Sequence, residues 1–394
     1  MKLFQKSTAG SRNKYYWLTA GLVIAGFLIG KGLSGNVKTI TISAVGDCTL
    51  GRNYKMDYAN SWDDCYSRYG AEYFLQNVSD VFHKDDITIA NLEGVLSESA
   101  PRQEEYYRQK QGKTARKKYC HLGKPEYLAA LTSGGVDAVS FANNHNIDYG
   151  LQGFEDTLNT CDAYHLPAAY YDNVVRMEVS GITVGIVSVD ATYCSLDIAE
   201  NYLRSAIADL RTDCGLIVSC VHWGKNYKTM PDDEQRYLGH LCVDLGADLV
   251  IGSHAHILQG VERYKGRYIF YSLGNFTYGG RAVPKDVDTM IAQQTFTFAD
   301  GELVVDDNVT ILPCWMSTQT EINDFCPVMK GGEEGAAVID KVNTLSANFG
   351  TKFDQLGHPS MEPAEETARE GCDPCPYEQK PQRVPSIIYT LLGE

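Results

Sequence analysis

The stretch "VDAVSFANNHNIDYG", residues 136–150, is an apolar run that ends abruptly in polar side chains. Residues 136–142 have the β-branched and apolar composition of a strand that is buried on both faces. Two asparagines, a histidine and an aspartate follow within residues 143–148, and a helical pattern comes next. The polar group therefore lies where a strand ends and a helix begins. In layered α/β sheets, ligands bind just beyond that end of the strands.

Outward from this stretch, other short runs have the same composition. They span residues 39–45, 86–92, 182–189, 215–221 and 247–253. Helical patterns lie between most of them, as in the segment that Pro231 opens, and this alternation predicts an α/β layered fold. Residues 267–276 and two β-rich stretches on either side of residues 299–301 predict an antiparallel continuation built around a hairpin.

Most of these predicted strands end in a side chain that can bind a metal. The residues are Asp47, Glu93, Asn144, His222, His254 and His256. Because strand carboxyl ends meet at one edge of a sheet, we expect these residues to converge on one crevice. The mixed oxygen and nitrogen donors suit one or two divalent ions of Mn, Fe or Zn. Strand alternation would put His254 and His256 on one side, where two buried imidazoles are hard to satisfy without a metal.

Each of these polar residues also has a purely structural interpretation. Asn143 and Asn144 could form turns, and Asp148 could cap the helix that follows it. A lone histidine is usually a satisfied structural group. We assign that role to the histidines away from the strand ends: His83, His121, His165, His240 and His358. The combination is what favours a metal centre, because six ligand-type side chains from distant segments are expected at one place.

The charge distribution excludes nucleic acid as a partner and divides the chain near its N-terminus. The formal net charge is −15, and no basic stripe offers a surface for phosphates. Residues 1–14 nevertheless carry four cations and no acid, which predicts a cytoplasmic basic segment. Residues 15–33, "YYWLTAGLVIAGFLIGKGL", predict a transmembrane signal-anchor helix, with a cleaved signal peptide as the alternative. Either interpretation puts the rest of the chain outside; with the anchor the protein is a single-pass cell-membrane protein.

The exported part contains all 12 cysteines, and its composition is uneven. An even count permits disulfides outside the cytoplasm, although the order of the cysteines does not give their pairing. The lone CxxC of Cys372 and Cys375 favours a local disulfide or two free thiols over a zinc site.

Residues 97–120 are charged and predict an exposed insertion, whereas residues 350–383 predict a loosely ordered tail. We therefore divide the exported part into a main extracellular domain at 38–320 and a partly disordered C-terminal extension at 321–394.

Six stretches between about residues 40 and 280 together carry a resemblance to one protein family, in which they occur in the same order. They are "AVGDCTLGR", "ANLEG", "GVDAVSFANNHNIDYG", "CVHWGKNY", "LGADLVIGSHAHILQ" and "YSLGNF". By these stretches the sequence resembles the poly-γ-glutamate capsule-synthesis (CapA/PgsA) family, whose domain is similar to the calcineurin-like metallophosphoesterases. The resemblance implies a four-layer α/β/β/α sandwich of metallophosphoesterase type, preceded by one transmembrane helix.

The same resemblance implies a role for each site residue. One metal would be held by Glu93, Asn144, His222 and His254, and the other by Asp47, Glu93 and His256. His145, oriented by Asp148, would protonate the leaving oxygen. Arg52 and Lys225 stand beside predicted ligands in the sequence, and from that position, rather than from the resemblance, we expect them to neutralise an anionic substrate.

This sequence departs from the family patterns in three places. Thr49 stands where the phosphoesterases have a histidine, two residues after Asp47, so one metal loses a ligand. Glu93 replaces their bridging aspartate and is longer by one methylene. Lys225 and Asn226 follow "HWG" where the capsule family usually has an acid.

Two functions fit these residues. In the first, the protein acts in synthesis or export of an anionic polymer, either poly-γ-glutamate or one that contains phosphoesters. Its site would then be a metal-dependent, phosphoesterase-like hydrolase. In the second, it is a noncatalytic subunit that binds metal or polyanion beside other capsule synthase or export subunits. The missing histidine at Thr49 favours the second, and the anchor would hold the protein near the synthase in both.

Overall fold

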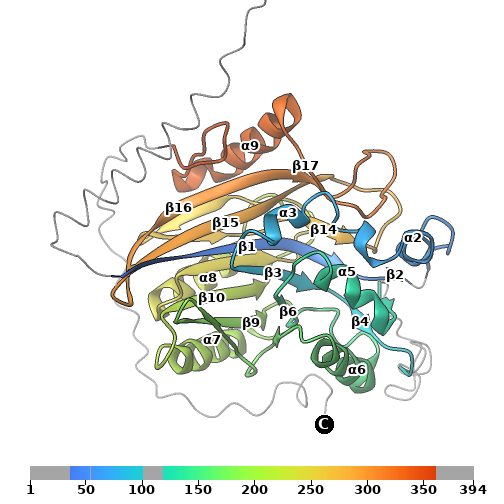
Figure 1. Ribbon diagram of the computed structural model, residues 1–394, viewed down its shortest axis with the longest axis horizontal. Helices are drawn as coiled ribbons and strands as arrows, with labels where there is room; N and C mark the ends of the chain where they lie inside the picture. Colours follow the sequence, from blue (N-terminus) through green and yellow to red (C-terminus); the bar gives the residue numbers. More distant parts are fainter. Residues whose placement is uncertain (1–35, 54, 101–118, 361–394) are drawn as a thin grey trace, which may run out of the picture.

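The computed structural model describes residues 36–53, 55–100 and 119–360 (Figure 1). The predicted segments at 1–14 and 15–33, most of the insertion at 97–120 and the tail after residue 360 lie outside these residues. Within the described part, no helix has both the length and the apolar character needed to cross a membrane. The anchor and the domain boundary at residue 320 stay predictions.

One sheet has eight strands, and we call it the first sheet. Seven strands follow the order β17–β16–β15–β1–β3–β6–β7, and β14 pairs with the end of β1. Their bounds are β1 (Val37–Thr49), β3 (Ile87–Leu92), β6 (Ala138–Ser140), β7 (Ala168–Ala169), β14 (Asn275–Tyr278), β15 (Asp288–Ala299), β16 (Glu302–Trp315) and β17 (Val328–Met329). β1, β3, β6 and β7 run parallel, whereas β15 and β16 form the predicted antiparallel hairpin.

The second sheet has six strands in the order β12–β13–β11–β10–β9–β8. Their bounds are β8 (Val175–Val179), β9 (Ile182–Asp190), β10 (Leu216–His222), β11 (Leu249–Ser253), β12 (Val261–Tyr264) and β13 (Arg267–Phe270). The inner strands are parallel, and each outer strand is antiparallel to its neighbour. A small third sheet joins β2 (Arg52–Asn53), β5 (His121–Gly123) and β4 (Val95–Leu96).

The two large sheets pack on each other through a largely apolar core. Ile40, Ile42 and Ile89 of the first sheet meet Val184, Val218 and other residues of the second sheet there. Apolar side chains buried on both faces of a strand explain why the runs identified in the sequence are continuous rather than alternating. All six predicted strands are found, as β1, β3, β6, β9, β10 and β11.

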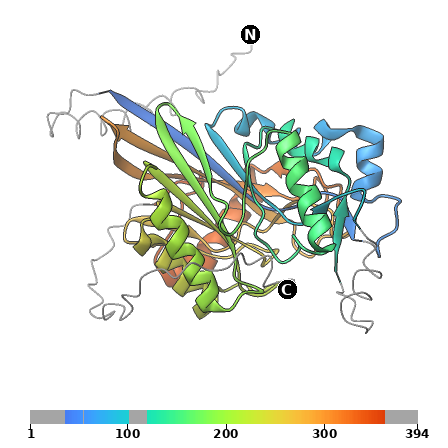
Figure 2. The same cartoon turned by 90° about the horizontal axis from the view of Figure 1, so that it is seen from below.

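Helices cover the outer faces of both sheets. On the first sheet, a second core cluster includes residues of α2 (Trp62–Tyr69), α3 (Ser79–Phe82), α5 (Ala129–Thr132) and α6 (Gly150–Ala163). On the second sheet, a third cluster includes α7 (Leu196–Leu210) and α8 (Asp233–Leu245). Figure 2 shows α7, in yellow-green, well separated from α2 and α6, because they cover different sheets. The mixed α/β fold with several sheets is therefore confirmed.

Helix α9 (Gly332–Ser346) lies beside β16 and also contacts β12 (Figure 1). Its buried side chains Val338, Ile339 and Val342 belong to the core between the two sheets. The helix therefore closes an edge of the sandwich. The apolar spacing of these three residues at i, i+1 and i+4 is that of a helix with one buried face.

The chain crosses from the second sheet to the first between β13 and β14. The sequence predicted one antiparallel continuation over residues 267–276, and this is wrong in part, since β14 runs parallel to β1. Gly274 has a φ of 78°, a left-handed conformation that favours glycine. A Cβ on Gly46 would collide with the Gly274 carbonyl oxygen, which instead accepts a hydrogen bond of 2.9 Å from Asp47 N. Two glycines thus allow β14 to lie directly against the end of β1.

Ten cysteines lie in the described residues, and no disulfide joins any two of them. Nine are buried and Cys194 is half-buried. Cys372 and Cys375 lie outside the described part. Burial raises the pKa of buried thiols such as Cys48 and Cys242 to about 12, so these side chains are protonated apolar groups that fill the core.

Candidate metal centre

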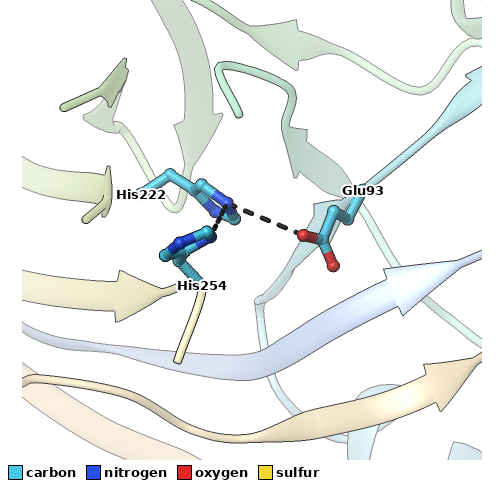
Figure 3. A group of neighbouring side chains, drawn as sticks. All are labelled: Glu93, His222 and His254. Carbon is cyan, nitrogen blue, oxygen red and sulfur yellow. Dashed lines mark hydrogen bonds and ion pairs between the residues drawn. The ribbon is translucent and has the colours of Figure 1, made fainter. Parts of the chain in front are cut away.

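All six predicted ligand residues lie together, at the carboxyl ends of the strands of both large sheets. Asp47 is on β1, Glu93 follows β3 and Asn144 follows β6, so the first sheet supplies the amide and both carboxylates. The second sheet supplies the imidazoles of His222, His254 and His256 from β10 and from the turn after β11. Figure 3 shows Glu93 facing His222 and His254 across this junction.

Glu93, Asn144, His222 and His254 form what we call the first cluster. His222 Nε2 lies 2.9 Å from Asn144 Oδ1. It also lies 3.0 Å from His254 Nδ1 and 3.7 Å from Glu93 Oε1, the two residues drawn with it in Figure 3. His222 and Glu93 are fully buried, and Asn144 is half-buried. His222 Nε2 therefore lies close to one donor atom of each of the other three residues.

Asp47, Glu93 and His256 form the second cluster. His256 Nδ1 lies 3.0 Å from Asp47 Oδ2 and 3.8 Å from Glu93 Oε2. Glu93 thus turns Oε1 towards the first cluster and Oε2 towards the second. This is the position of a carboxylate that bridges two ions.

The separations of 2.9 to 3.0 Å are those of neighbouring ligands of one divalent ion, and the two separations to Glu93, 3.7 and 3.8 Å, correspond to a wider angle at the ion. Two ligands that each lie about 2.1 Å from an ion, at angles between a right angle and the tetrahedral value, are about 3.0 to 3.4 Å apart. The potential at the site also favours a cation. Burial alone would lower the pKa of His256, but the Glu93 and Asp47 carboxylates outweigh it and raise that pKa to about 9. The residues present therefore fit a two-ion centre of nitrogen and oxygen donors.

His254 and His256 reach the two clusters by a route that the sequence did not indicate. We expected both on one side of a strand, but β11 ends at Ser253. His254 has a φ of 92° and His256 a φ of 58°, so both lie in a turn of left-handed backbone. Non-glycine residues rarely adopt this conformation, and it is concentrated at functional sites. The turn directs His254 to the first cluster and His256 to the second.

Neighbouring polar groups hold the ligands in place. Ser253 Oγ lies 2.7 Å from His222 Nδ1, so the other ring nitrogen faces the first cluster. Asn91 donates a hydrogen bond of 2.8 Å to Asp47 Oδ1 and leaves Oδ2 towards the second cluster. Asn143 donates to the Leu92 carbonyl oxygen and accepts a hydrogen bond from His145 N. Asn143 thus ties the loop after β6 to the end of β3.

His145 and Asp148 form a buried pair beside the first cluster. His145 Nδ1 lies 2.6 Å from Asp148 Oδ2, and His145 Nε2 lies 3.9 Å from Glu93 Oε1. The alternative role of Asp148 as a helix cap is wrong, because α6 begins after Tyr149 and has no side-chain cap. Asp148 instead orients His145.

His121, to which we assigned a structural role, lies in this site as well. Its ring centroid is 4.4 Å from that of His145 and 5.9 Å from that of Tyr278, and its backbone N–H donates to Asp148 Oδ2 at 2.9 Å. Nothing in the sequence around His121 indicated this, because β5 meets the site only through the small third sheet.

The predicted substrate-binding residues lie outside both clusters. Arg52 is half-buried on β2, with its guanidinium carbon 5.2 Å from the centre of the Tyr58 ring. Lys225 is exposed. Their roles stay predictions.

Two other cations lie near the second cluster. The Tyr227 ring is 5.9 Å from the His256 ring, and its backbone N–H donates to the Ala255 carbonyl oxygen at 2.8 Å. Lys285 Nζ lies 3.7 Å from the centre of the Tyr227 ring, and the Arg281 guanidinium carbon lies 5.6 Å from it. We call Arg281 and Lys285, both from the loop between β14 and β15, the Tyr227 cations.

Comparison with solved structures gives only distant likenesses. A hypothetical protein from Thermus thermophilus has a TM-score of 0.41 and 15% identity, and the match covers 70% of this chain and 99% of that one. A 5'-nucleotidase from Candida albicans has a TM-score of 0.38 and 9% identity, covering 80% and 59%. With scores this low, neither likeness carries an argument about fold or function.

Comparison with characterised sequences is more informative. The chain is 30% identical over 263 residues to the capsule biosynthesis protein CapA of Bacillus anthracis, covering 61% of this chain and 60% of that protein. It is 28% identical over 281 residues to the PGA biosynthesis protein CapA of Bacillus subtilis (strain 168), covering 65% and 69%. A probable polyglutamine synthesis accessory protein of Mycobacterium tuberculosis is 28% identical over 192 residues, covering 41% and 50%. The matches thus span only part of each relative's length.

The model of the bacterial capsule synthesis protein PGA_cap matches residues 41–279, which hold both clusters. The matched region contains all six predicted ligand residues as well as His145 and Asp148. Because the match covers more than half of the residues, the chain belongs to the bacterial capsule synthesis protein family PGA_cap.

Proposed function

We propose that this chain is a membrane-tethered, extracellular protein that acts in the synthesis or export of poly-γ-glutamate or a related anionic polymer. It would carry a metal-dependent hydrolase site on a four-layer domain of the metallophosphoesterase type. The bond cleaved would be a phosphoester, or an ester or amide bond of the polymer. The family match and the printed roles of the two Bacillus relatives support the polymer.

One observation carries the catalytic part of this proposal, namely the His145–Asp148 pair. Asp148 Oδ2 lies 2.6 Å from His145 Nδ1, which leaves Nε2 on the side of Glu93 and the first cluster. A site that only binds metal does not need a buried imidazole with its own orienting carboxylate. A site that must donate a proton to a leaving group does.

Each part of the centre then has a chemical task. Glu93, Asn144, His222 and His254 would hold one ion, and Asp47, Glu93 and His256 the other. When bound, such a pair of ions supplies Lewis acidity and an activated water for displacement at phosphorus or carbon. His145 Nε2 gives its proton to the leaving atom, and Asp148 stabilises the imidazolium before that transfer and fixes the ring.

The Tyr227 cations support an anionic substrate. Arg281 and Lys285 both lie against Tyr227, whose ring is beside His256 of the second cluster. They would neutralise a carboxylate or phosphate of the polymer next to the reacting bond. The N-terminal pattern at residues 15–33 supports the tether, and a reporter fused at either end of the protein tests the topology.

The second candidate is a noncatalytic subunit of a synthesis or export complex. Thr49 supports it, since a fully buried hydroxyl stands where the phosphoesterases have a metal-binding histidine. Loss of a ligand would weaken the binding of one ion and would lower or abolish turnover.

Metal analysis and turnover separate the two candidates. We expect full-length protein in detergent to hold two ions per chain and to hydrolyse a generic phosphodiester with added Mn²⁺. Chelation should abolish that activity and metal should restore it. Bound metal without turnover of phosphodiester, ester or γ-glutamyl amide, together with retention of poly-γ-glutamate, would support the noncatalytic subunit. Protein that holds no metal contradicts the hydrolase, and protein that holds neither metal nor poly-γ-glutamate contradicts both candidates.

Replacing Arg281 and Lys285 with alanine should weaken substrate binding more than catalysis. Two charges that contact the anionic polymer equally in the bound and transition states set KM rather than kcat. We expect KM to rise about tenfold or more, in steady-state kinetics at low salt, and the difference from the unsubstituted protein to shrink at high salt. Lys84→Ala removes an exposed lysine elsewhere and should leave KM unchanged. A double variant with the original KM would show that the Tyr227 cations do not contact substrate.

A further inference from the structure

In the ligand set predicted from the sequence, the second cluster has one metal-binding donor fewer than the first. Among the described residues each cluster has three Asp, Glu or His donors, and Asn144 gives the first cluster a fourth, whereas the ligands predicted for the second are only Asp47, Glu93 and His256. Thr49 does not make up the difference. Its hydroxyl is fully buried and makes no hydrogen bond among the described residues, and a neutral hydroxyl is not among the side-chain groups that usually hold Mn, Fe or Zn.

Asn275, at the start of β14, lies where a fourth donor would be needed. β1 and β14 pair in parallel with Asp47 opposite Asn275. The close approach of Gly46 to Gly274 makes this pairing possible, as described above. As a result Asn275 Oδ1 is 2.9 Å from His256 Nδ1, which is also 3.0 Å from Asp47 Oδ2.

The orientation of the Asn275 amide is fixed by a second contact. Its Nδ2 donates a hydrogen bond of 3.2 Å to the His256 carbonyl oxygen, so Oδ1 must face the ring of His256. Asn275 is buried, with an exposed fraction of 6%. One imidazole nitrogen thus faces two oxygens at nearly equal distances, although a single N–H points well at only one acceptor. A cation between the three atoms accounts for this arrangement.

The first cluster contains the same arrangement. There, Asn144 Oδ1 lies 2.9 Å from His222 Nε2, the same separation as that between Asn275 Oδ1 and His256 Nδ1. Each cluster then has one amide oxygen and one oxygen of Glu93. The first is completed by two imidazoles, and the second by one imidazole and one carboxylate.

We propose that Asn275 Oδ1 is the fourth protein donor of the second metal position. It replaces the histidine of the phosphoesterases, where this chain has Thr49. The inference rests on the metal centre of the proposed function but not on turnover. It also explains why the chain crosses between the sheets at this point. The segment of Gly274 and Asn275, where β14 begins, delivers a ligand to the end of β1 that β1 itself does not carry.

Metal binding to variants at Asn275 tests the proposal without any activity assay. We expect calorimetric titration of metal-free, full-length protein with Mn²⁺ to show two sites. In Asn275→Ala, one of the two sites should lose about ten- to a hundredfold in affinity while the other is unchanged. Asn144→Ala is the matched control and should weaken the other site instead. Asn275→Asp keeps an oxygen donor and should retain both ions, which provides a measurement if the alanine variant does not fold.

A metal-bound crystal structure with anomalous scattering distinguishes a ligand from a group that only orients His256. A ligand places Oδ1 about 2.0 to 2.4 Å from the second ion. A distance beyond 3 Å would overturn the proposal, as would unchanged affinity in Asn275→Ala or a wild-type protein with one site only. Wild-type protein that binds two ions through Asn275 but turns over no substrate would contradict the proposed hydrolase and leave this inference standing.

Discussion

Replacing Glu93 with glutamine should remove both ions. If the protein is the hydrolase proposed here, the substitution should also lower turnover at least about a thousandfold. Glu93 is fully buried, and each of its oxygens faces one cluster: Oε1 is 3.7 Å from His222 Nε2 and Oε2 is 3.8 Å from His256 Nδ1. Glutamine has nearly the same shape but is neutral and replaces one oxygen donor with an amide nitrogen that carries two hydrogens. In one of the two clusters, the amide NH₂ group, a hydrogen-bond donor, therefore stands where a metal-binding oxygen is needed.

The charge change adds to the loss of a ligand. Without Glu93, the Asp47 carboxylate alone must offset the positive charge of the ions in this buried space, where solvent screens poorly. Metal content by elemental analysis should fall from two ions per chain to fewer than one. His254→Ala is the comparison, because it touches only the first cluster and should leave the second ion bound. Retention of two ions and full turnover by Glu93→Gln would show that Glu93 does not bridge.

The sequence predicted those parts of the site that follow from local rules. Asp47, Glu93 and His222 were found because each follows an apolar run, and the carboxyl ends of neighbouring parallel strands must meet. The hairpin of β15 and β16 was found for a similar reason, since residues 299–301 form a turn between two β-rich runs. In both cases neighbouring residues decide the structure.

The sequence did not predict the parts that depend on contacts between distant segments. Asn275 was missed as a ligand because its place is set by the pairing of β14 with β1, more than two hundred residues earlier. His121 and Tyr227 reach the site through a small sheet and a loop that have no periodic pattern. The left-handed turns at His254 and His256 were also missed, because tertiary contacts rather than local preference hold non-glycine residues in that conformation.

The difference between these two groups of residues explains how the site is built. Strand ends supply the carboxylates and the imidazole of His222, which any chain with this order of strands would bring together. The tight contact of Gly46 with Gly274 and the turn after β11 then add Asn275, His254 and His256. These three donors thus lie where a strand begins or has just ended, next to loops rather than within the strands that the sequence predicted.

Replacing His145 with glutamine should lower kcat about a hundred- to ten-thousandfold while both ions stay bound. His145 Nε2 is 3.9 Å from Glu93 Oε1, so the ring lies beside the first cluster without completing it. Glutamine keeps a polar side chain of similar length but cannot donate a proton as an acid. Elemental analysis should therefore give two ions for the variant, in contrast to Glu93→Gln.

The identity of the leaving group provides the decisive measurement. A nitrophenolate leaves without protonation, whereas an alkoxide or an amine needs a proton from the enzyme. The loss of kcat in His145→Gln should therefore be small for a nitrophenyl ester and large for an alkyl ester or an amide. Asp148→Asn should show the same dependence, because Asp148 holds the proton-bearing ring in position from 2.6 Å. Equal losses with both kinds of leaving group would mean that the pair supports the structure of the site and does not transfer a proton.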